Sequence, residues 1–146
     1  TIKKEFFDLA KKYEKNPNIH FHFKFDEKLA HLIYSSADCI LVPSIFEPCG
    51  LTQMIALRYG TIPIVHNIGG LKDTIFDIDN NSIPIEMRNG YTFSDPSFES
   101  LRESIDRAFS DLDNVEKWSE MVRNGFNRDW SWKVPALEYL KIYRSH

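Results

Sequence analysis

The chain has few cysteines, no excess of positive charge and no long apolar run. Its two cysteines, Cys39 and Cys49, lack the spacing of a zinc site and are too few for a disulfide framework, so we expect no metal and a reducing compartment. The formal net charge is -3 and the basic residues are scattered, so we expect no nucleic-acid partner. Residues 1–7 lack the apolar core of a secretory signal, and nothing in the sequence suggests a membrane partner.

The remaining composition is that of a globular protein. With 146 residues, of which 42% are hydrophobic and 14% aromatic, the chain is long enough for one domain with a core and too short for two ordinary ones. The first residue is not methionine and already belongs to a helical pattern. We therefore expect the chain to be part of a longer polypeptide.

Hydrophobic periodicity predicts alternating helices and strands. Period-two patterns or short apolar runs predict strands at Ile19–Phe25, Cys39–Val42, Thr61–Val65 and Tyr91–Phe93. Helical spacing predicts helices over 2–13, after a cap at Asp26, over 54–59 and over 71–76, and three more after caps at Asp95, Asp113 and Ser131. Pro63 is expected near a sheet edge or a strand end. The pattern predicts an α/β fold with a Rossmann-like parallel sheet, flanking helices and a helical C-terminal third.

The segment 43–53, Pro-Ser-Ile-Phe-Glu-Pro-Cys-Gly-Leu-Thr-Gln, lies between a predicted strand and a predicted helix. In such folds ligands bind outside the carboxyl ends of the strands, where a helix N-terminus offers unpaired N–H groups to a phosphate. Glu47, Gly50 and Thr52 would lie at this edge, and Gly69–Gly70 follows the next strand. This arrangement is typical of half of a sugar-nucleotide site.

Three stretches, residues 46–53, 56–65 and 69–74, resemble the signature of the starch and glycogen synthases, glycosyltransferase family 5. Residues 31–38 and 130–139 resemble flanking helices of the same family, so the resemblance covers about the whole chain. It is closest to the starch synthase III type.

The resemblance implies a retaining GT-B glucosyltransferase that moves glucose from ADP-glucose to the non-reducing end of an α-1,4-glucan. Residues 1–146 would form a single, partial C-terminal nucleotide-sugar-binding domain whose partner is a missing N-terminal domain of the same polypeptide. No cofactor is implied, because ADP-glucose is the donor substrate. The compartment would be a plastid in a plant or alga and the cytoplasm in a bacterium.

The resemblance also assigns site residues. Glu47 would be the catalytic residue that holds hydroxyls of the donor glucose, because a carboxylate accepts paired hydrogen bonds from vicinal hydroxyls. The donor would further meet Cys49, Gly50, Leu51, Thr52, Gly69 and Gly70. Tyr34 would lie near the adenine or, as an alternative, pack in the core.

Several family features are absent or changed. The Lys and Arg that clamp the diphosphate have no counterpart here, Ile68 replaces the usual threonine, and Ile55 stands where related enzymes carry a ribose-binding glutamate. We therefore expect the isolated chain not to catalyse transfer.

Each motif has a simpler alternative. Glu47 could do no more than stabilise a helix N-terminus by its negative charge. The glycine pair could be an ordinary turn, and Cys49 could be a packing residue. His20 and His22 have no evident third metal ligand, and Trp130 could contact glucan or anchor the last helix. At the level of function, the alternatives are a non-catalytic glucan-binding or regulatory module and a GT-B transferase that uses a UDP-sugar.

Overall fold

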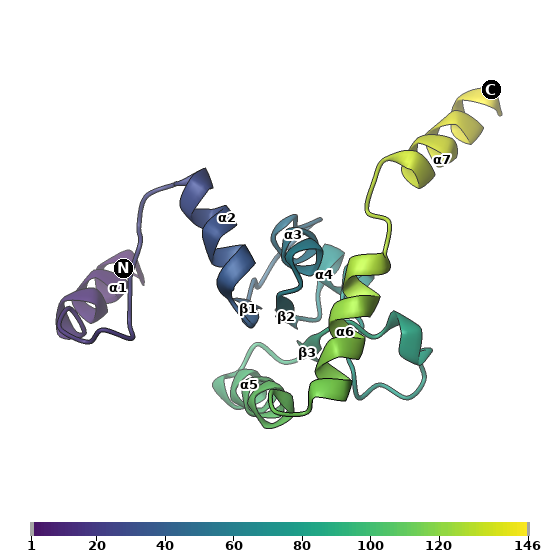
Figure 1. Ribbon diagram of the computed structural model, residues 1–146. Helices are drawn as coiled ribbons and strands as arrows, with labels where there is room; N and C mark the ends of the chain where they lie inside the picture. The colour runs from purple at the N-terminus through teal and green to yellow at the C-terminus, as the bar shows by residue number, and fades with distance from the viewer. Residues whose placement is uncertain (1, 146) are drawn as a thin grey trace. The chain divides into compact units, whose positions relative to one another are not determined.

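The computed structural model describes residues 2–145 and divides into two compact units, one up to Ala30 and the other from His31 onward (Figure 1). The helices and strands have the following bounds: α1 Ile2–Lys12, α2 Glu27–Ser36, β1 Cys39–Val42, α3 Thr52–Tyr59, β2 Ile62–His66, α4 Gly69–Thr74, η1 Ile85–Met87, β3 Tyr91–Phe93, α5 Phe98–Asp111, α6 Val115–Asn127 and α7 Lys133–Arg144. The predicted α/β fold with a helical C-terminal third is confirmed.

The three strands form a parallel sheet in the order β1-β2-β3. Pro63 is the second residue of the central strand and is buried. The Ile62 N–H donates to the Asp38 carbonyl on the β1 side, so strand alternation turns the Pro63 nitrogen toward β3. Pairing with β3 begins only at Ile64, and the missing N–H of Pro63 therefore removes no bond from the ladder.

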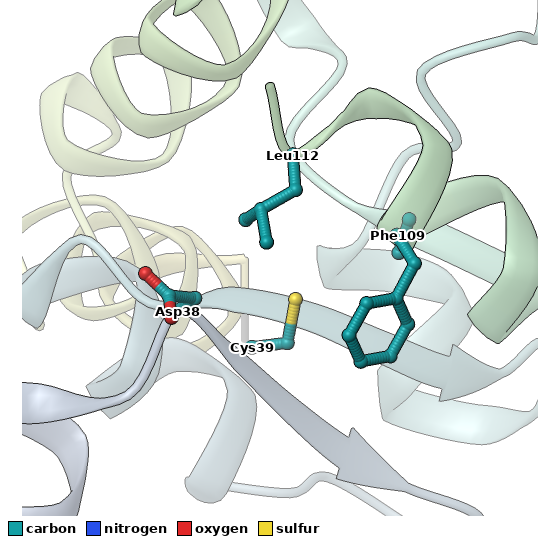
Figure 2. Close-up of a pocket in the computed structure, with 5 residues that line it drawn as sticks. Asp38, Cys39, Phe109 and Leu112 are labelled. Carbon is teal, nitrogen blue, oxygen red and sulfur yellow. The ribbon is translucent and has the colours of Figure 1, made fainter. Parts of the chain in front are cut away.

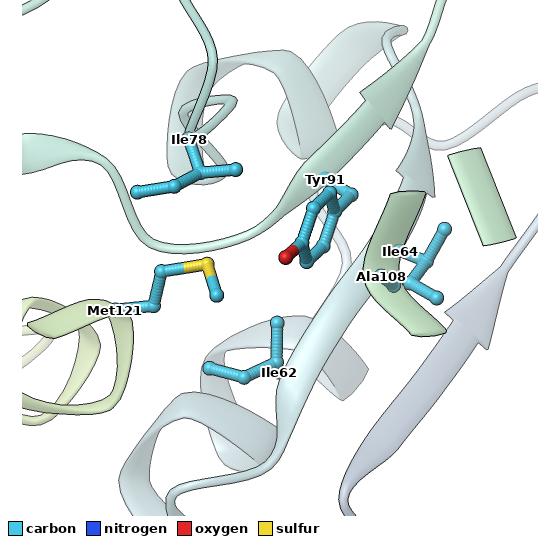
Figure 3. Close-up of a cluster of buried hydrophobic side chains, with 6 residues drawn as sticks. All are labelled: Ile62, Ile64, Ile78, Tyr91, Ala108 and Met121. Atoms are coloured by element: carbon cyan, nitrogen blue, oxygen red, sulfur yellow. The ribbon is translucent and has the colours of Figure 1, made fainter. Parts of the chain in front are cut away.

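Helices cover both faces of the sheet. On one face, the strand residues Ile62, Ile64 and Tyr91 form a buried cluster with Ala108 of α5 and Met121 of α6 (Figure 3). On the other face, a cluster around Val65 takes Leu57 from α3 and Leu71 from α4. This division follows from the period of two in a strand, which sends Ile64 and Val65 to opposite sides. The chain runs from the carboxyl ends of β1 and β2 to the starts of α3 and α4, two helices that pack on the same face of the sheet.

Helix caps agree only in part with those predicted. Asp26 caps α2 as expected, since its Oδ1 accepts a hydrogen bond from the Leu29 N–H at 2.9 Å. The caps at Asp95 and Asp113 were wrong by one or two residues: Ser97 accepts from Ser100 at the start of α5, and Asn114 accepts from Lys117 at the start of α6. Ser, Asn and Asp are nearly equivalent as caps, so the sequence alone does not choose between close neighbours.

The segment Ile19–Phe25 is not a strand, and that prediction was wrong. A strand exists only when a neighbouring strand takes its N–H and C=O groups, and no described residue pairs with this segment. Within the first unit its aromatic side chains instead pack locally, with the ring centroids of Phe7 and Phe23 4.3 Å apart.

The polar excursion 77–88 is held by specific bonds. The Arg88 guanidinium donates to the carbonyl oxygens of Ile83 and Ile78 at 2.8 and 3.1 Å. At its start, Asp77 forms an ion pair with Arg107 of α5 at 2.9 Å. This segment is thereby tied to the helix that covers β3.

Candidate functional site

Two loops meet at the carboxyl ends of the strands. We call residues 43–51, after β1, the signature turn, and residues 67–70, after β2, the glycine turn. The Gly70 N–H donates to the Glu47 carbonyl oxygen at 2.9 Å, which joins the two turns through their backbones. The sequence prediction that Glu47, Gly50 and the glycine pair share one edge of the sheet agrees with this arrangement.

Glycine is required where the turns touch. A β-carbon at Gly69 would lie 2.0 Å from the Glu47 carbonyl oxygen, and one at Gly70 would lie 2.0 Å from the Cys49 carbonyl oxygen. Gly69 and Gly50 also have positive φ angles of 49° and 75°, a backbone region that side chains disfavour. The contact between the turns is therefore backbone against backbone, with no room for a side chain.

The carboxylate of Glu47 is half-buried and has one polar neighbour in the described residues. The Ser44 Oγ–H donates to Glu47 Oε2 at 3.3 Å. His66, the last residue of β2, is buried and its Nδ1 lies 2.7 Å from the Ser44 carbonyl oxygen, to which it donates as the Nδ1–H tautomer. Oε1 of Glu47 remains available to accept further hydrogen bonds.

Unpaired backbone donors lie next to Glu47. Within the described part of the chain, the N–H groups of Gly50, Leu51 and Thr52 donate no hydrogen bond. Thr52 begins α3, so these groups are at the positive end of the helix dipole. The Gly70 N–H, in contrast, donates to the Glu47 carbonyl oxygen within the protein.

Sequence reasoning assigned no role to Gln53, although it ends the quoted motif. Its side chain is 0% exposed and connects the signature turn to α4 through hydrogen bonds of Nε2. The available signal was its polarity at a helix position facing the core, where buried polar groups need partners.

Tyr34 does not join this cluster. Its ring stacks on that of Tyr59, with centroids 6.2 Å apart, and Tyr59 ends α3, whose first residue lies in the site. The eight residues of α3 separate the two ends by about 10 Å. This position favours the alternative role for Tyr34, packing at the far end of the sheet.

The other predicted aromatic positions are divided between core and surface. Trp118 packs against the cluster under α5 and α6, as expected for an inward helical position. Trp130 packs beside Val65 and Leu71, and Arg128 lies over its ring at 5.0 Å. Trp132 is 72% exposed and precedes α7.

A separate cavity lies at the other end of β1. It has a volume of about 240 Å³ and is lined by Asp38, Cys39, the α5 side chains Ala108 and Phe109, and Leu112 just after α5 (Figure 2). Burial, and then the negative charge of Asp38, raise the pKa of the Cys39 thiol to about 11. The thiol is therefore protonated near neutral pH and is a poor nucleophile.

Sequence comparison identifies the family. The description Glycosyl transferases group 1 matches residues 2–125. The chain belongs to this family. It is 46% identical over 146 residues to the glycogen synthase of Protochlamydia amoebophila, covering 99% of this chain and 29% of that protein. It is 41% identical to a probable chloroplastic/amyloplastic starch synthase 4 of Arabidopsis thaliana, covering 97% of this chain and 14% of that protein.

Two solved structures agree with the fold. The catalytic domain of starch synthase IV from Arabidopsis thaliana, bound to ADP and acarbose, superposes with a TM-score of 0.93 at 40% identity, over 99% of this chain and 29% of that one. A sucrose-phosphate synthase from Thermosynechococcus elongatus superposes with a TM-score of 0.67 at 25% identity, over 97% of this chain and 33% of that one. The resemblance to the starch and glycogen synthases is confirmed, and the type III assignment stays a prediction.

The chain thus spans 29% of the length of the glycogen synthase that it matches. In residues 2–145, no helix has both the length and the apolar character needed to cross a membrane. The relatives include a chloroplastic starch synthase and bacterial glycogen synthases.

Proposed function

We propose that the chain is the donor-binding part of a retaining glucosyltransferase that extends an α-1,4-glucan from ADP-glucose. The observation that carries this proposal is the joining of the signature turn to the glycine turn beside Glu47, in a group 1 transferase 46% identical to a glycogen synthase. The glucan acceptor and the diphosphate-clamping Lys and Arg would belong to the rest of the polypeptide. The enzyme would work in a plastid or in a bacterial cytoplasm, according to its source.

In this proposal the signature turn and the first residue of α3 have two chemical tasks. The free carboxylate oxygen of Glu47 accepts hydrogen bonds from hydroxyls of the donor glucose and holds its ring against the sheet edge. The N–H groups of Gly50, Leu51 and Thr52 point toward developing negative charge as the diphosphate leaves. Donors fixed in the folded protein need no reorganisation during the reaction, and this is the reason that they stabilise a transition state.

Replacement of the Glu47 carboxylate tests the proposal. In the complete polypeptide, Glu47→Gln keeps the size of the side chain but weakens its acceptance of sugar hydroxyls, so transfer of glucose from ADP-glucose to glycogen should fall by about 100-fold or more. The measurement is kcat/KM with radiolabelled ADP-glucose. Glu86→Gln, an exposed change on η1, is the matched control and should leave transfer unaltered.

The outcomes separate the candidate functions. Full transfer by Glu47→Gln would remove this residue from the site. Glycogen binding without transfer from any nucleotide sugar by the wild-type polypeptide would favour a glucan-binding or regulatory module instead. Faster transfer from UDP-glucose than from ADP-glucose would support a glucosyltransferase whose donor is a UDP-sugar.

A further inference from the structure

A buried amide connects the two turns from below. Gln53 Nε2 lies 3.2 Å from the Cys49 carbonyl oxygen, 2.9 Å from that of Gly50 and 3.1 Å from Thr74 Oγ1. Cys49 and Gly50 belong to the signature turn, whereas Thr74 ends α4, the helix that the glycine turn begins. One side chain therefore holds two segments that are 21 residues apart in the sequence.

The hydroxyl of Thr74 extends this connection. Thr74 Oγ1 donates to the Gly70 carbonyl oxygen at 2.7 Å and can therefore only accept from Gln53. The bonds run from the carbonyls of the signature turn, through the amide of Gln53 and the hydroxyl of Thr74, to the carbonyl of Gly70 in the glycine turn. We call Gln53 and Thr74, with these bonds, the bridge. Gln53 is 0% exposed and Thr74 is 9% exposed, so water does not readily replace these bonds.

The three oxygens around Gln53 Nε2 require a hydrogen-bond donor at this position. Carbonyl oxygens have no hydrogen to give, so a flipped amide or a carboxylate would place oxygen against oxygen. Gln53 Oε1 is buried and has no partner among the described residues, so the amide makes its hydrogen bonds through Nε2 alone. A β-carbon at Gly50 would lie 2.6 Å from this oxygen, so the glycine also makes room for the amide.

We propose that Gln53 and Thr74 are positioning residues that fix the signature turn and the glycine turn to each other so that both meet the same nucleotide-sugar donor. This inference rests on the proposed function for the identity of the donor. It assigns to the bridge no contact with substrate. Its effect is on the relative placement of Glu47, the free N–H groups of the signature turn and the glycine turn.

Kinetics in the complete polypeptide test the proposal. Gln53→Met and Thr74→Val each remove the bridge with little change of volume, and each should raise KM for ADP-glucose by about tenfold while KM for glycogen stays constant. Gln53→Met combined with Thr74→Val should be no worse than either alone, because one loss already breaks the connection. Thr74→Ser retains the hydroxyl and should stay close to the wild type.

Thr61→Val is the matched control. Thr61 is also buried, and its hydroxyl also donates to backbone carbonyls, those of Tyr34 and Ala37, but it lies at the opposite end of β2. This variant should lower the thermal midpoint without changing KM for ADP-glucose. An equal rise of that KM in Thr61→Val, or additive effects of Gln53→Met and Thr74→Val, would overturn the proposal.

Hydrogen exchange tests, independently of activity, whether Gln53 and Thr74 connect the two turns. Thr74→Val should speed exchange at the Ile55 N–H, which donates to Leu51 in the signature turn, and Gln53→Met should speed exchange at the Gly70 N–H. Exchange that rises only in the altered segment would refute the bridge. If the wild type transfers glucose from no nucleotide sugar, the proposed function fails. The positioning role is then still supported or refuted by whether a substitution in one segment speeds hydrogen exchange in the other.

Discussion

Gly70 shows how closely the two turns approach at the level of single residues. The carbonyl oxygen of Cys49 occupies the space in which a side chain at Gly70 would begin, and the Gly70 N–H donates to Glu47. A substitution here must push the signature turn away from the glycine turn. The position of the Glu47 carboxylate therefore depends on a residue that has no side chain.

We predict that Gly70→Ala in the complete polypeptide weakens donor binding by about tenfold or more, because backbone contacts at this distance cannot relax without moving a turn. Affinity for ADP-glucose, measured by calorimetry, checks this. Gly60→Ala is the control: Gly60 follows the last residue of α3 as its C-terminal cap, with a φ of 83°, so the variant should lose stability but keep donor affinity. Normal donor affinity in Gly70→Ala would contradict the donor-site assignment of the glycine turn.

At the level of elements, β3 is held to its covering helix by charge as well as by apolar contact. The Asp77 carboxylate accepts from both Arg107 nitrogens and from the Thr92 N–H in β3. Burial opposes ionisation of Asp77, but these hydrogen bonds and the Arg107 charge outweigh it and lower the pKa of Asp77 below its ordinary value near 3.8. The Asp79 carboxylate extends the network to Lys117 of α6.

A lowered pKa in the folded state gives stability that is present above the unfolded value and lost as pH falls through the folded one. We predict that Asp77→Asn lowers the free energy needed to open β3 locally by about 1–2 kcal/mol at pH 7. The difference from wild type should shrink below about pH 4. Hydrogen-exchange protection of β3, corrected for intrinsic rates, measures it.

Asp106→Asn is the control for this pH dependence. It removes an exposed i,i+4 pair with Arg102 on the same helix, where both side chains are more than half exposed, and should change protection little. A difference between Asp77→Asn and wild type that grows toward low pH would show that the sign of the Asp77 contribution is wrong.

At the level of the whole molecule, much apolar surface has no cover among the described residues. The helix α7 has no buried residue, and Val134 and Leu137 are 61% and 59% exposed. On α2, Leu32 is 57% exposed, and Leu41 of β1 is 41% exposed at the free edge of the sheet. Patches of this kind mark surfaces that bind another part of a polypeptide or associate.

We predict that the 146-residue chain, expressed alone, transfers no glucose from ADP-glucose and elutes in size-exclusion chromatography above its monomer mass of 17.1 kDa. The relatives are more than three times as long, so the acceptor side and the diphosphate clamp are expected outside this chain. The complete polypeptide should be active under the same assay. A monomeric and active chain would contradict both expectations.

The sequence by itself determined the order of the elements from α2 to α7, apart from η1, and the edge of the sheet at which the site lies. The apolar runs predicted β1, β2 and β3, and the turn residues after β1 and β2 placed Glu47 and the glycine pair at one edge, because carboxyl ends of parallel strands lie together. Periodicity and turn chemistry are local properties, and one chain is enough to reveal them.

Only the tertiary structure decided how the parts meet. The period of Ile19–Phe25 indicated a strand, but pairing depends on a neighbour that periodicity cannot supply. Tyr34 precedes the site in sequence yet lies at the other end of α3, next to Tyr59. Gln53 gained its role only when folding brought Thr74 within 3.1 Å, because a hydrogen bond between distant segments is set by packing and leaves no local pattern.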